Sequence, residues 1–150
     1  MRDLVMAKKV LVVAAHPDDE VLGCGGTLAK HVDNGDIVKT IIIAEGVTSR
    51  HYQRDRNLAS NSLSSLSLAA DKASKILGIS SLELLDFPDN RLDSLDRLDL
   101  IKVIETYVNA FDPSIVYLHH AGDVNIDHRR LHESVITACR PTPGNSVDAY

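Results

Sequence analysis

The amino-acid sequence predicts an α/β fold: a doubly wound, mostly parallel Rossmann-like sheet with helices on both faces. Two observations predict it. Strand-like apolar runs alternate with segments of helical periodicity along the chain, which is the pattern of repeated β-α units. Crossovers between parallel strands are nearly always right-handed, which favours helices packed on both faces of one sheet. The 150 residues, 44% of them hydrophobic and 25% charged, suit a single domain over residues 1–150.

The first half of the chain predicts two strands and two helices. Residues 9–15 form a continuous β-branched run, which is typical of a strand buried on both faces. The pattern becomes helical over about 20–32 and ends at an Asp-Asn-Gly turn, after which residues 36–44 are again strand-like. Residues 45–57 contain several basic side chains without an apolar period and predict a long exposed loop. Leucines at helical spacing then predict a helix over 60–77.

The second half repeats this alternation. A short apolar run predicts a strand over residues 82–85, and the polar residues 86–93 predict the loop that follows it. Helical periodicity predicts a helix over 94–110, and the apolar residues 115–118 predict a fourth strand. After another polar loop, residues 128–138 have helical periodicity again. The four strand-helix pairs therefore cover nearly the whole chain.

Charge and composition exclude several classes of function. The chain has 16 Lys and Arg against 21 Asp and Glu, a net charge of −5, which argues against a nucleic-acid partner because such binding depends on clustered basic side chains. The longest apolar runs fall far short of the ~18 residues that a membrane span needs, and the first nine residues lack the apolar stretch of a signal peptide. We therefore expect a cytoplasmic protein without a membrane span, and an oligomer is compatible with this composition.

Polar side chains follow each predicted strand. In an open parallel sheet ligands bind beyond the carboxyl ends of the strands, so these side chains should converge. Two of the four groups combine histidines with carboxylates, and a surface loop does not require such a combination. The residues are His16, Asp18, Asp19 and Glu20 after the first strand, Glu45 after the second, Asp86 and Asp89 after the third, and His119, His120, Asp123, Asn125, Asp127 and His128 after the fourth.

Three adjacent carboxylates after the first strand point to a bound cation. Asp18, Asp19 and Glu20 repel one another, and a divalent cation relieves that repulsion. Imidazole and carboxylate donors suit zinc, and His16 and Asp19 can meet on one ion. Asp18 is then free to take a proton from water. The alternative is structural, because Asp18 or Asp19 could simply cap the predicted helix that follows.

A third metal ligand has to come from another part of the chain. A catalytic zinc ion usually has three protein ligands and an open position for water. His128, His119 and His120 all follow the fourth predicted strand and are the available imidazoles. The residues alone leave the choice among these three open.

Two motifs resemble the PIG-L/LmbE-like family of zinc-dependent sugar N-deacetylases. The first is Ala15-His-Pro-Asp-Asp-Glu20 after a valine-rich strand, and the second is Asp123-Val-Asn-Ile-Asp-His-Arg129 about a hundred residues later. Residues 87–90 and 140–141 resemble further segments of the family in the same order. The family domain usually runs longer, so we expect this chain to lack its C-terminal part.

The resemblance implies a reaction and the residues that perform it. His16, Asp19 and His128 match the zinc ligands of the family, and Asp18 matches its general base. Fe²⁺ is an alternative to Zn²⁺ in such a site. Family members remove the acetyl group from an N-acetylglucosamine-type sugar or glycoconjugate. The sequence is therefore expected to encode an amide hydrolase with an N-acetylated sugar substrate.

The chain departs from the family at the group that donates a proton. Asn125 stands where some members have a histidine that stabilises the oxyanion or protonates the amine. An amide can donate a hydrogen bond to an oxyanion, but it cannot transfer a proton. His119, His120 or a reprotonated Asp18 would then act as the acid. The carboxylates expected to orient the catalytic groups or hold their loops are Glu20, Asp123 and Asp127.

A second departure concerns the substrate. Many members have an Arg and a Glu about one turn apart in the second helix, where this chain has Leu66 and Ala69. Substrate contacts then fall to the basic loop before that helix, so Arg50 and Arg54 are candidate substrate-binding residues. Asp89, in the loop after the third predicted strand, is the third candidate.

Two other functions compete with this hypothesis. A nucleotide-binding Rossmann module would use the glycines at 23–26, but these come late and residues 18–20 would repel a pyrophosphate. A phosphoacceptor receiver domain would use the acidic pair after the first strand together with Asp86. It also needs a hydroxyl residue after the fourth strand and a lysine after a fifth, and His119 stands at the former position.

Overall fold

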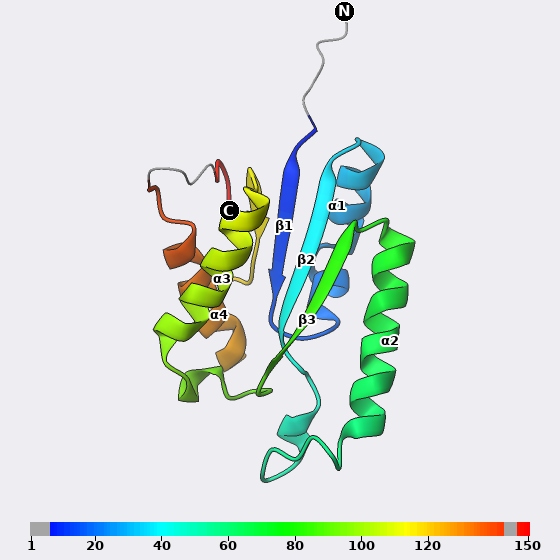
Figure 1. The fold of residues 1–150 in the computed structure, drawn as a ribbon, viewed down its shortest axis with the longest axis vertical. Helices are drawn as coiled ribbons and strands as arrows, with labels where there is room; N and C mark the ends of the chain where they lie inside the picture. Colours follow the sequence, from blue (N-terminus) through cyan, green and yellow to red (C-terminus); the bar gives the residue numbers. More distant parts are fainter. Residues whose placement is uncertain (1–6, 143–146) are drawn as a thin grey trace, which may run out of the picture.

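A computed structural model describes residues 7–142 and 147–150 of the chain. Four parallel strands form one sheet in the order β3-β2-β1-β4 (Figure 1). This arrangement confirms the predicted doubly wound α/β fold. The elements are β1 (Lys9–Ala14), α1 (Asp19–Asp33), β2 (Ile37–Ala44), η1 (Thr48–Arg50), α2 (Ser60–Leu77), β3 (Ser81–Phe87), η2 (Leu92–Ser94), α3 (Arg97–Phe111), β4 (Ile115–Tyr117) and α4 (Ile126–Ala138).

The helices pack in pairs on the two faces of the sheet. Helices α3 and α4 cover one face, where Ile104 of α3 and Leu131 of α4 share a hydrophobic cluster with Val13 of β1. Helices α1 and α2 lie on the other face, where Leu28 of α1 shares a cluster with Val12 of β1 (Figure 1). Alternate residues of β1 therefore enter different hydrophobic clusters. This burial on both sides explains why the strand is a continuous apolar run rather than an alternating one.

The order of the strands determines where a ligand can bind. β1 is central and pairs with β2 on one side and β4 on the other. The chain therefore leaves the carboxyl ends of β1 and β4 toward opposite faces, and an open crevice remains between the two connections. The histidine- and carboxylate-rich segments that follow β1 and β4 lie at this crevice.

Two helices begin at other residues than the periodicity predicts, because polar side chains cap them. α3 starts at Arg97 rather than near residue 94, since the side chain of Asp96 accepts a hydrogen bond from the amide of Leu98. α4 starts at Ile126 rather than near residue 128, since the side chain of Asn125 accepts one from the amide of Asp127. An apolar period does not reveal such caps, because the capping residues lie outside it.

The loop after β2 is joined tightly to the turn after β1. Gly46 has a φ of +74°, a conformation that favours glycine. A Cβ atom at this position would lie 2.8 Å from Cδ of Pro17. The backbone conformation and the short distance to Pro17 both disfavour a residue with a side chain. Glycine at position 46 therefore allows the start of this loop to lie close to the turn that carries His16.

The described end of the chain adds to the sheet. Ile115 forms an isolated parallel bridge with Ala149. Residues 143–146 of this tail lie outside the described residues, as do residues 1–6, on which part of the signal-peptide prediction rests. Among the helices that the structure describes, none combines the length and the apolar character needed to cross a membrane.

Candidate active site

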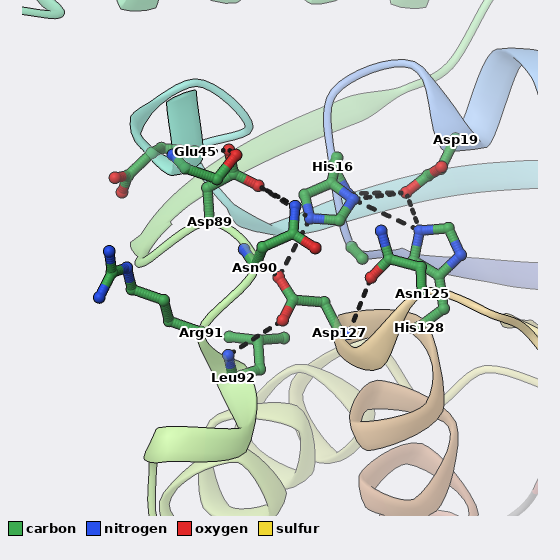
Figure 2. Close-up of polar contacts among 12 residues, drawn as sticks. His16, Asp19, Glu45, Asp89, Asn90, Arg91, Leu92, Asn125, Asp127 and His128 are labelled. Atoms are coloured by element: carbon green, nitrogen blue, oxygen red, sulfur yellow. Dashed lines mark hydrogen bonds and ion pairs between the residues drawn. The ribbon is translucent and has the colours of Figure 1, made fainter. Parts of the chain in front are cut away.

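Three side chains from two distant parts of the sequence converge beyond the carboxyl end of β1. His16 and Asp19 come from the turn after β1 and the first residue of α1, and His128 comes from the first turn of α4 (Figure 2). Nδ1 of His16 lies 3.4 Å from Oδ2 of Asp19, and Nε2 of His128 lies 3.2 Å from the same oxygen. The two ring nitrogens are 3.4 Å apart. These three atoms form a nearly equilateral triangle, called the metal triangle below.

The size of this triangle suits a tetrahedral metal site. Ligand atoms at the ~2.0–2.1 Å that zinc prefers, separated by tetrahedral angles, lie about 3.3 Å from each other. The three separations between His16, Asp19 and His128 are 3.2–3.4 Å. The side chains are 12–18% exposed, so the triangle is accessible from one side and protected on the others. The donor set and its spacing fit a divalent cation without rearrangement.

Carboxylates hold the opposite nitrogen of each imidazole. Nε2 of His16 lies 3.1 Å from Oδ2 of Asp127, and Nδ1 of His128 lies 2.9 Å from Oδ2 of Asp123. A carboxylate accepts a hydrogen bond from a ring N–H, so in the neutral imidazole the nitrogen that faces Asp19 is left with a lone pair. Both rings are thereby oriented with their lone pairs toward one point.

The carboxylates around His16 favour a positive charge at the cluster. Burial lowers the pKa of His16, but hydrogen bonds to Asp127, Asp19 and Asp89 outweigh burial and raise that pKa to about 11. Burial raises the pKa of Asp19, but its hydrogen bonds with His16 hold the pKa below the usual value. The surrounding carboxylates therefore favour positive charge at this position, and a metal ion can supply it.

Asp127 of α4 and Asp89 of the loop after β3 support His16 from the side away from the triangle. Asp127 is fully buried and accepts hydrogen bonds from the amides of Asn90, at 2.7 Å, and Leu92, at 3.0 Å. Asp89 lies 3.3 Å from Nε2 of His16 and accepts hydrogen bonds from the amide and hydroxyl of Ser49. Burial raises the pKa of Asp89, but its hydrogen bonds with His16 and Ser49 outweigh burial and lower that pKa to about 2. The loops after β2 and β3 are thus fixed to the cluster.

The cluster lies at one side of an open cleft of about 760 Å³. Asp18 lines this cleft with an exposed side chain, which makes no capping hydrogen bond to α1. This geometry removes the capping alternative for Asp18. Asn125 also lines the cleft. Its Oδ1 caps α4, and its amide nitrogen has no hydrogen-bond partner among the described residues. A carboxylate and a hydrogen-bond donor therefore both have access to a bound ligand.

His119 lies behind the triangle and does not line the cleft. Its Nε2 accepts a hydrogen bond from the amide of Ala15 at 2.8 Å, and its ring stacks on that of His128, with the ring centroids 3.8 Å apart. Burial and the neighbouring His128 lower the pKa of His119 to about 4. The ring is therefore held as a neutral hydrogen-bond acceptor.

Two further residues that the sequence singled out also lie outside the cleft lining. His120 is exposed, and its Nδ1 accepts a hydrogen bond from the amide of Gly122. Glu20 is buried and accepts a hydrogen bond from the amide of Asp18, so it shapes the turn after β1. The structure thus brings His128, and not His120, to the metal triangle.

The PIG-L family model, described as GlcNAc-PI de-N-acetylase, matches residues 11–139. This chain belongs to that family. The match includes both motifs and every residue of the metal triangle. It gives the two alternatives, a nucleotide-binding module and a receiver domain, no support. Asp86, which a receiver domain would phosphorylate, is instead paired with Arg54 and Arg56 outside the cleft.

Proteins that are named as deacetylases are similar to this PIG-L chain. It is 30% identical over 141 residues to the uncharacterized deacetylase YaiS of Escherichia coli, covering 91% of this chain and 70% of YaiS. It is 32% identical over 112 residues to the diacetylchitobiose deacetylase of Thermococcus kodakarensis, covering 74% of this chain and 40% of the relative. The structure of the N,N'-diacetylchitobiose deacetylase of Pyrococcus horikoshii matches with a TM-score of 0.69 and 25% identity, covering 94% of this chain and 53% of that one. The chain thus spans between two fifths and seven tenths of these relatives.

The candidate substrate-binding residues of this PIG-L chain occupy three different positions. Arg50 lines the cleft. Arg54 is not among the lining residues, because it donates hydrogen bonds to the buried carboxylate of Glu45 and to Asp86. Asp89 lines the cleft but is 3% exposed and hydrogen-bonded to Ser49. Arg50 is therefore the candidate whose charged group is free to meet a ligand.

Sequence reasoning missed part of the cleft wall. Asn61, Ser62 and Ser65 of α2 line the cleft, whereas the sequence showed only a serine-rich helix with a leucine period. Ser49 was also missed, although it fixes Asp89. The helical spacing of 61, 62 and 65 on one face could have indicated a polar face, but no pattern in the sequence says what that face contacts.

Proposed function

We propose that this chain forms the catalytic part of a metal-dependent N-deacetylase that removes the acetyl group from an N-acetylglucosamine-type sugar or glycoconjugate. The observation that carries the proposal is the triangle formed by His16, Asp19 and His128 beside an open cleft. Membership of the PIG-L family and similarity to deacetylases of N-acetylated sugars support the choice of reaction. The size of the cleft is within the ~300–1,000 Å³ typical of small-molecule sites.

His16, Asp19 and His128 would hold the cation, and Zn²⁺ fits their two nitrogens and one oxygen best. Fe²⁺ accepts the same donors and is the alternative. When bound, the cation supplies a Lewis acid that polarises the amide carbonyl and lowers the pKa of water. Asp127 and Asp123 keep the two rings in the tautomers that leave lone pairs toward it.

Asp18 would be the general base of the reaction. Its carboxylate is exposed in the cleft, next in sequence to a metal ligand, and has no hydrogen-bond partner among the described residues that would compete for a proton. The Asn125 amide would donate a hydrogen bond to the oxyanion that develops on the acetyl carbonyl. Since His119 accepts a hydrogen bond and lies behind the triangle, Asp18 would also return the proton to the amine that leaves.

Metal content and acetate release, measured on the same preparations, test this proposal. The purified protein is expected to contain about one equivalent of zinc or iron and to release acetate from N-acetylglucosaminides, and a chelator should abolish the release. Asp19→Ala should lose both the metal and the activity, because it removes one corner of the triangle. Asp93→Ala, which changes an aspartate outside the cleft lining, is the matched control and should retain both.

The proposal fails if metal-loaded protein releases no acetate from any of a panel of N-acetylated sugars. It also fails if Asp19→Ala keeps full metal content and activity, since the triangle would then have no part in either.

A further inference from the structure

The lining of the cleft contains groups of both charges. It includes the histidines and carboxylates of the metal triangle, together with Asp18. The lining also contains Arg50, which belongs to the short helix η1. No other lysine or arginine lines the cleft as far as the structure describes it. A ligand in the cleft therefore meets acidic groups around the triangle and a guanidinium elsewhere.

Arg50 differs from the other arginines near this end of the sheet, because its guanidinium has no partner among the described residues. Arg54 donates hydrogen bonds to Glu45 and Asp86. The side chain of Arg91 donates one to the carbonyl of Tyr52, and that of Arg129 donates two to carbonyls of the loop before α4. The five N–H donors of the Arg50 guanidinium are thus free for a ligand.

The backbone that carries Arg50 is nevertheless fixed. Thr48, the first residue of η1, is fully buried, and its hydroxyl donates a hydrogen bond to Glu45. Ser49 donates hydrogen bonds from its amide, at 3.1 Å, and from its hydroxyl, at 2.5 Å, to Asp89. Asp89 in turn contacts His16. The backbone at Arg50 is thus connected through Ser49 and Asp89 to His16 of the metal triangle.

The part of the lining that α2 contributes is uncharged. Helix α2 contributes Asn61, Ser62 and Ser65, which can hydrogen-bond to hydroxyl groups, and Leu66 and Ala69, which are apolar. These residue types suit a neutral sugar ring, and they supply no second positive charge. The guanidinium of Arg50 is therefore the group in the described lining that can discriminate an anionic substrate from a neutral one.

We propose that the substrate carries an anionic group, a carboxylate or a phosphate, on the part of the molecule away from the acetamide, and that Arg50 binds this group. The proposal rests on the proposed deacetylase function of the same cleft. A guanidinium pairs with either oxyanion through two parallel hydrogen bonds, which fixes orientation as well as charge. Asp18 and Asp19 repel an anion, so the anionic end turns toward Arg50 and the neutral acetamide toward the metal triangle.

Deacetylation kinetics with matched substrates test the proposal. The three substrates are N-acetylglucosamine 1-phosphate, an N-acetylglucosaminide with a carboxylate on its aglycone, and the neutral methyl N-acetylglucosaminide. The wild-type protein is expected to prefer an anionic substrate at least about tenfold in kcat/KM. Arg50→Gln should lower kcat/KM for that substrate about 10- to 100-fold, mainly through KM, and change the neutral one less than about twofold. Comparison of the two anionic substrates distinguishes phosphate from carboxylate.

Two further variants control for charge and for folding. Arg50→Lys keeps the charge without the two parallel hydrogen bonds, so it should recover only part of the preference. Arg97→Gln removes an exposed arginine of α3 outside the cleft and should leave all three substrates unchanged. Equal loss on the anionic and neutral substrates in Arg50→Gln, or no loss on either, overturns the proposal while leaving the deacetylase function intact.

A binding measurement separates this proposal from the proposed function. Calorimetry with N-acetylglucosamine 1-phosphate and with the carboxylate substrate should give a Kd about tenfold higher in Arg50→Gln for the preferred anion, and the difference should shrink at high salt. A protein that binds the anion through Arg50 but releases no acetate contradicts the deacetylase function and not this inference. Equal affinities in the two proteins overturn this inference alone.

Discussion

Asp18 and Asp19 are neighbours in the sequence, yet their surroundings are different. Asp19 lies within 3.5 Å of nitrogens of His16, His128 and His119, so its carboxylate is enclosed by imidazoles. Asp18 lines the cleft with an exposed side chain and forms no ion pair with these histidines. A one-residue step at the start of α1 thus separates a group that can bind a cation from a group that can exchange a proton.

This separation predicts distinct phenotypes for the two aspartates. Asp18→Asn should keep the metal content of the wild-type protein and lose acetate release by about 10²–10⁴-fold, because an amide cannot accept the proton. Metal analysis and acetate release on one preparation measure both effects. If the variant turns over at the wild-type rate, Asp18 is not the base.

The sequence was most informative at this scale where residues come in a local motif. His16, Asp18 and Asp19 are close together in the sequence. The repulsion between the carboxylates of Asp18 and Asp19 already indicated a bound cation. The position of His119 was not predictable, because it depends on a hydrogen bond from the amide of Ala15, which lies in a distant part of the sequence. The support that Asp127 gives to His16 spans 111 positions and appears only in the folded chain.

At the scale of elements, the buried carboxylate of Glu45 helps to hold the loop after β2 in place. The side chain of Glu45 is 4% exposed and accepts hydrogen bonds from Arg54, at 2.6 and 3.0 Å, and from Thr48. Burial raises the pKa of Glu45, but these hydrogen bonds outweigh burial and hold that pKa below the usual value. The folded pKa is therefore lower than the unfolded one, so this contribution to stability is present above about pH 4.5 and is lost as the pH falls through the folded pKa.

Arg54→Ala should accordingly destabilise the protein in a pH-dependent way. At pH 7 it leaves the buried Glu45 carboxylate without its main partner, at an expected cost of about 1–3 kcal/mol. Without Arg54, fewer hydrogen bonds offset the burial of the Glu45 carboxylate, so protonation of Glu45 relieves the cost of burying its charge. The difference in the free energy of unfolding between the variant and the wild-type protein should therefore narrow below about pH 4.5. Urea unfolding at several pH values measures this, with Arg97→Ala as the control. A constant difference from pH 7 to pH 4 would contradict the explanation.

Element type was predictable from hydrophobic period, and α2 has the predicted bounds, Ser60–Leu77. Element ends were less predictable where a side chain sets them, as Asp96 and Asn125 do. The sequence also did not show that Gly46 is required by contact with Pro17, since two separate turns have to be placed before that contact exists.

At the scale of the whole molecule, the metal triangle links the two faces of the sheet. His16 and Asp19 belong to the connection between β1 and α1, whereas His128 belongs to α4 on the opposite face. A ligand that binds the folded state alone stabilises the entire fold. The strand order β3-β2-β1-β4 brings the two sides together. The predicted parallel topology anticipated that the segments after the first and fourth strands converge, but not which histidine of the later segment completes the triangle.

Cation binding should therefore raise the thermal stability of the protein as a whole. At a free Zn²⁺ concentration about 100 times Kd, the expected gain is about 2.7 kcal/mol, which corresponds to a rise in Tm of about 5–10 °C. His128→Ala should show little of this rise, because it removes the ligand from α4. Calorimetry of both proteins with and without Zn²⁺ measures it, and an equal rise in both would mean that zinc acts elsewhere.

The spacing of the ligands along the chain also has a kinetic consequence. His16 and His128 are separated by 112 positions, and closing so long a loop is among the slow steps of folding. The first segment alone offers only two ligands, which hold a cation weakly until the last helix docks. High-affinity uptake of a cation from solution would then occur no faster than completion of the native topology, so the time course of uptake during refolding would report when the final helix arrives.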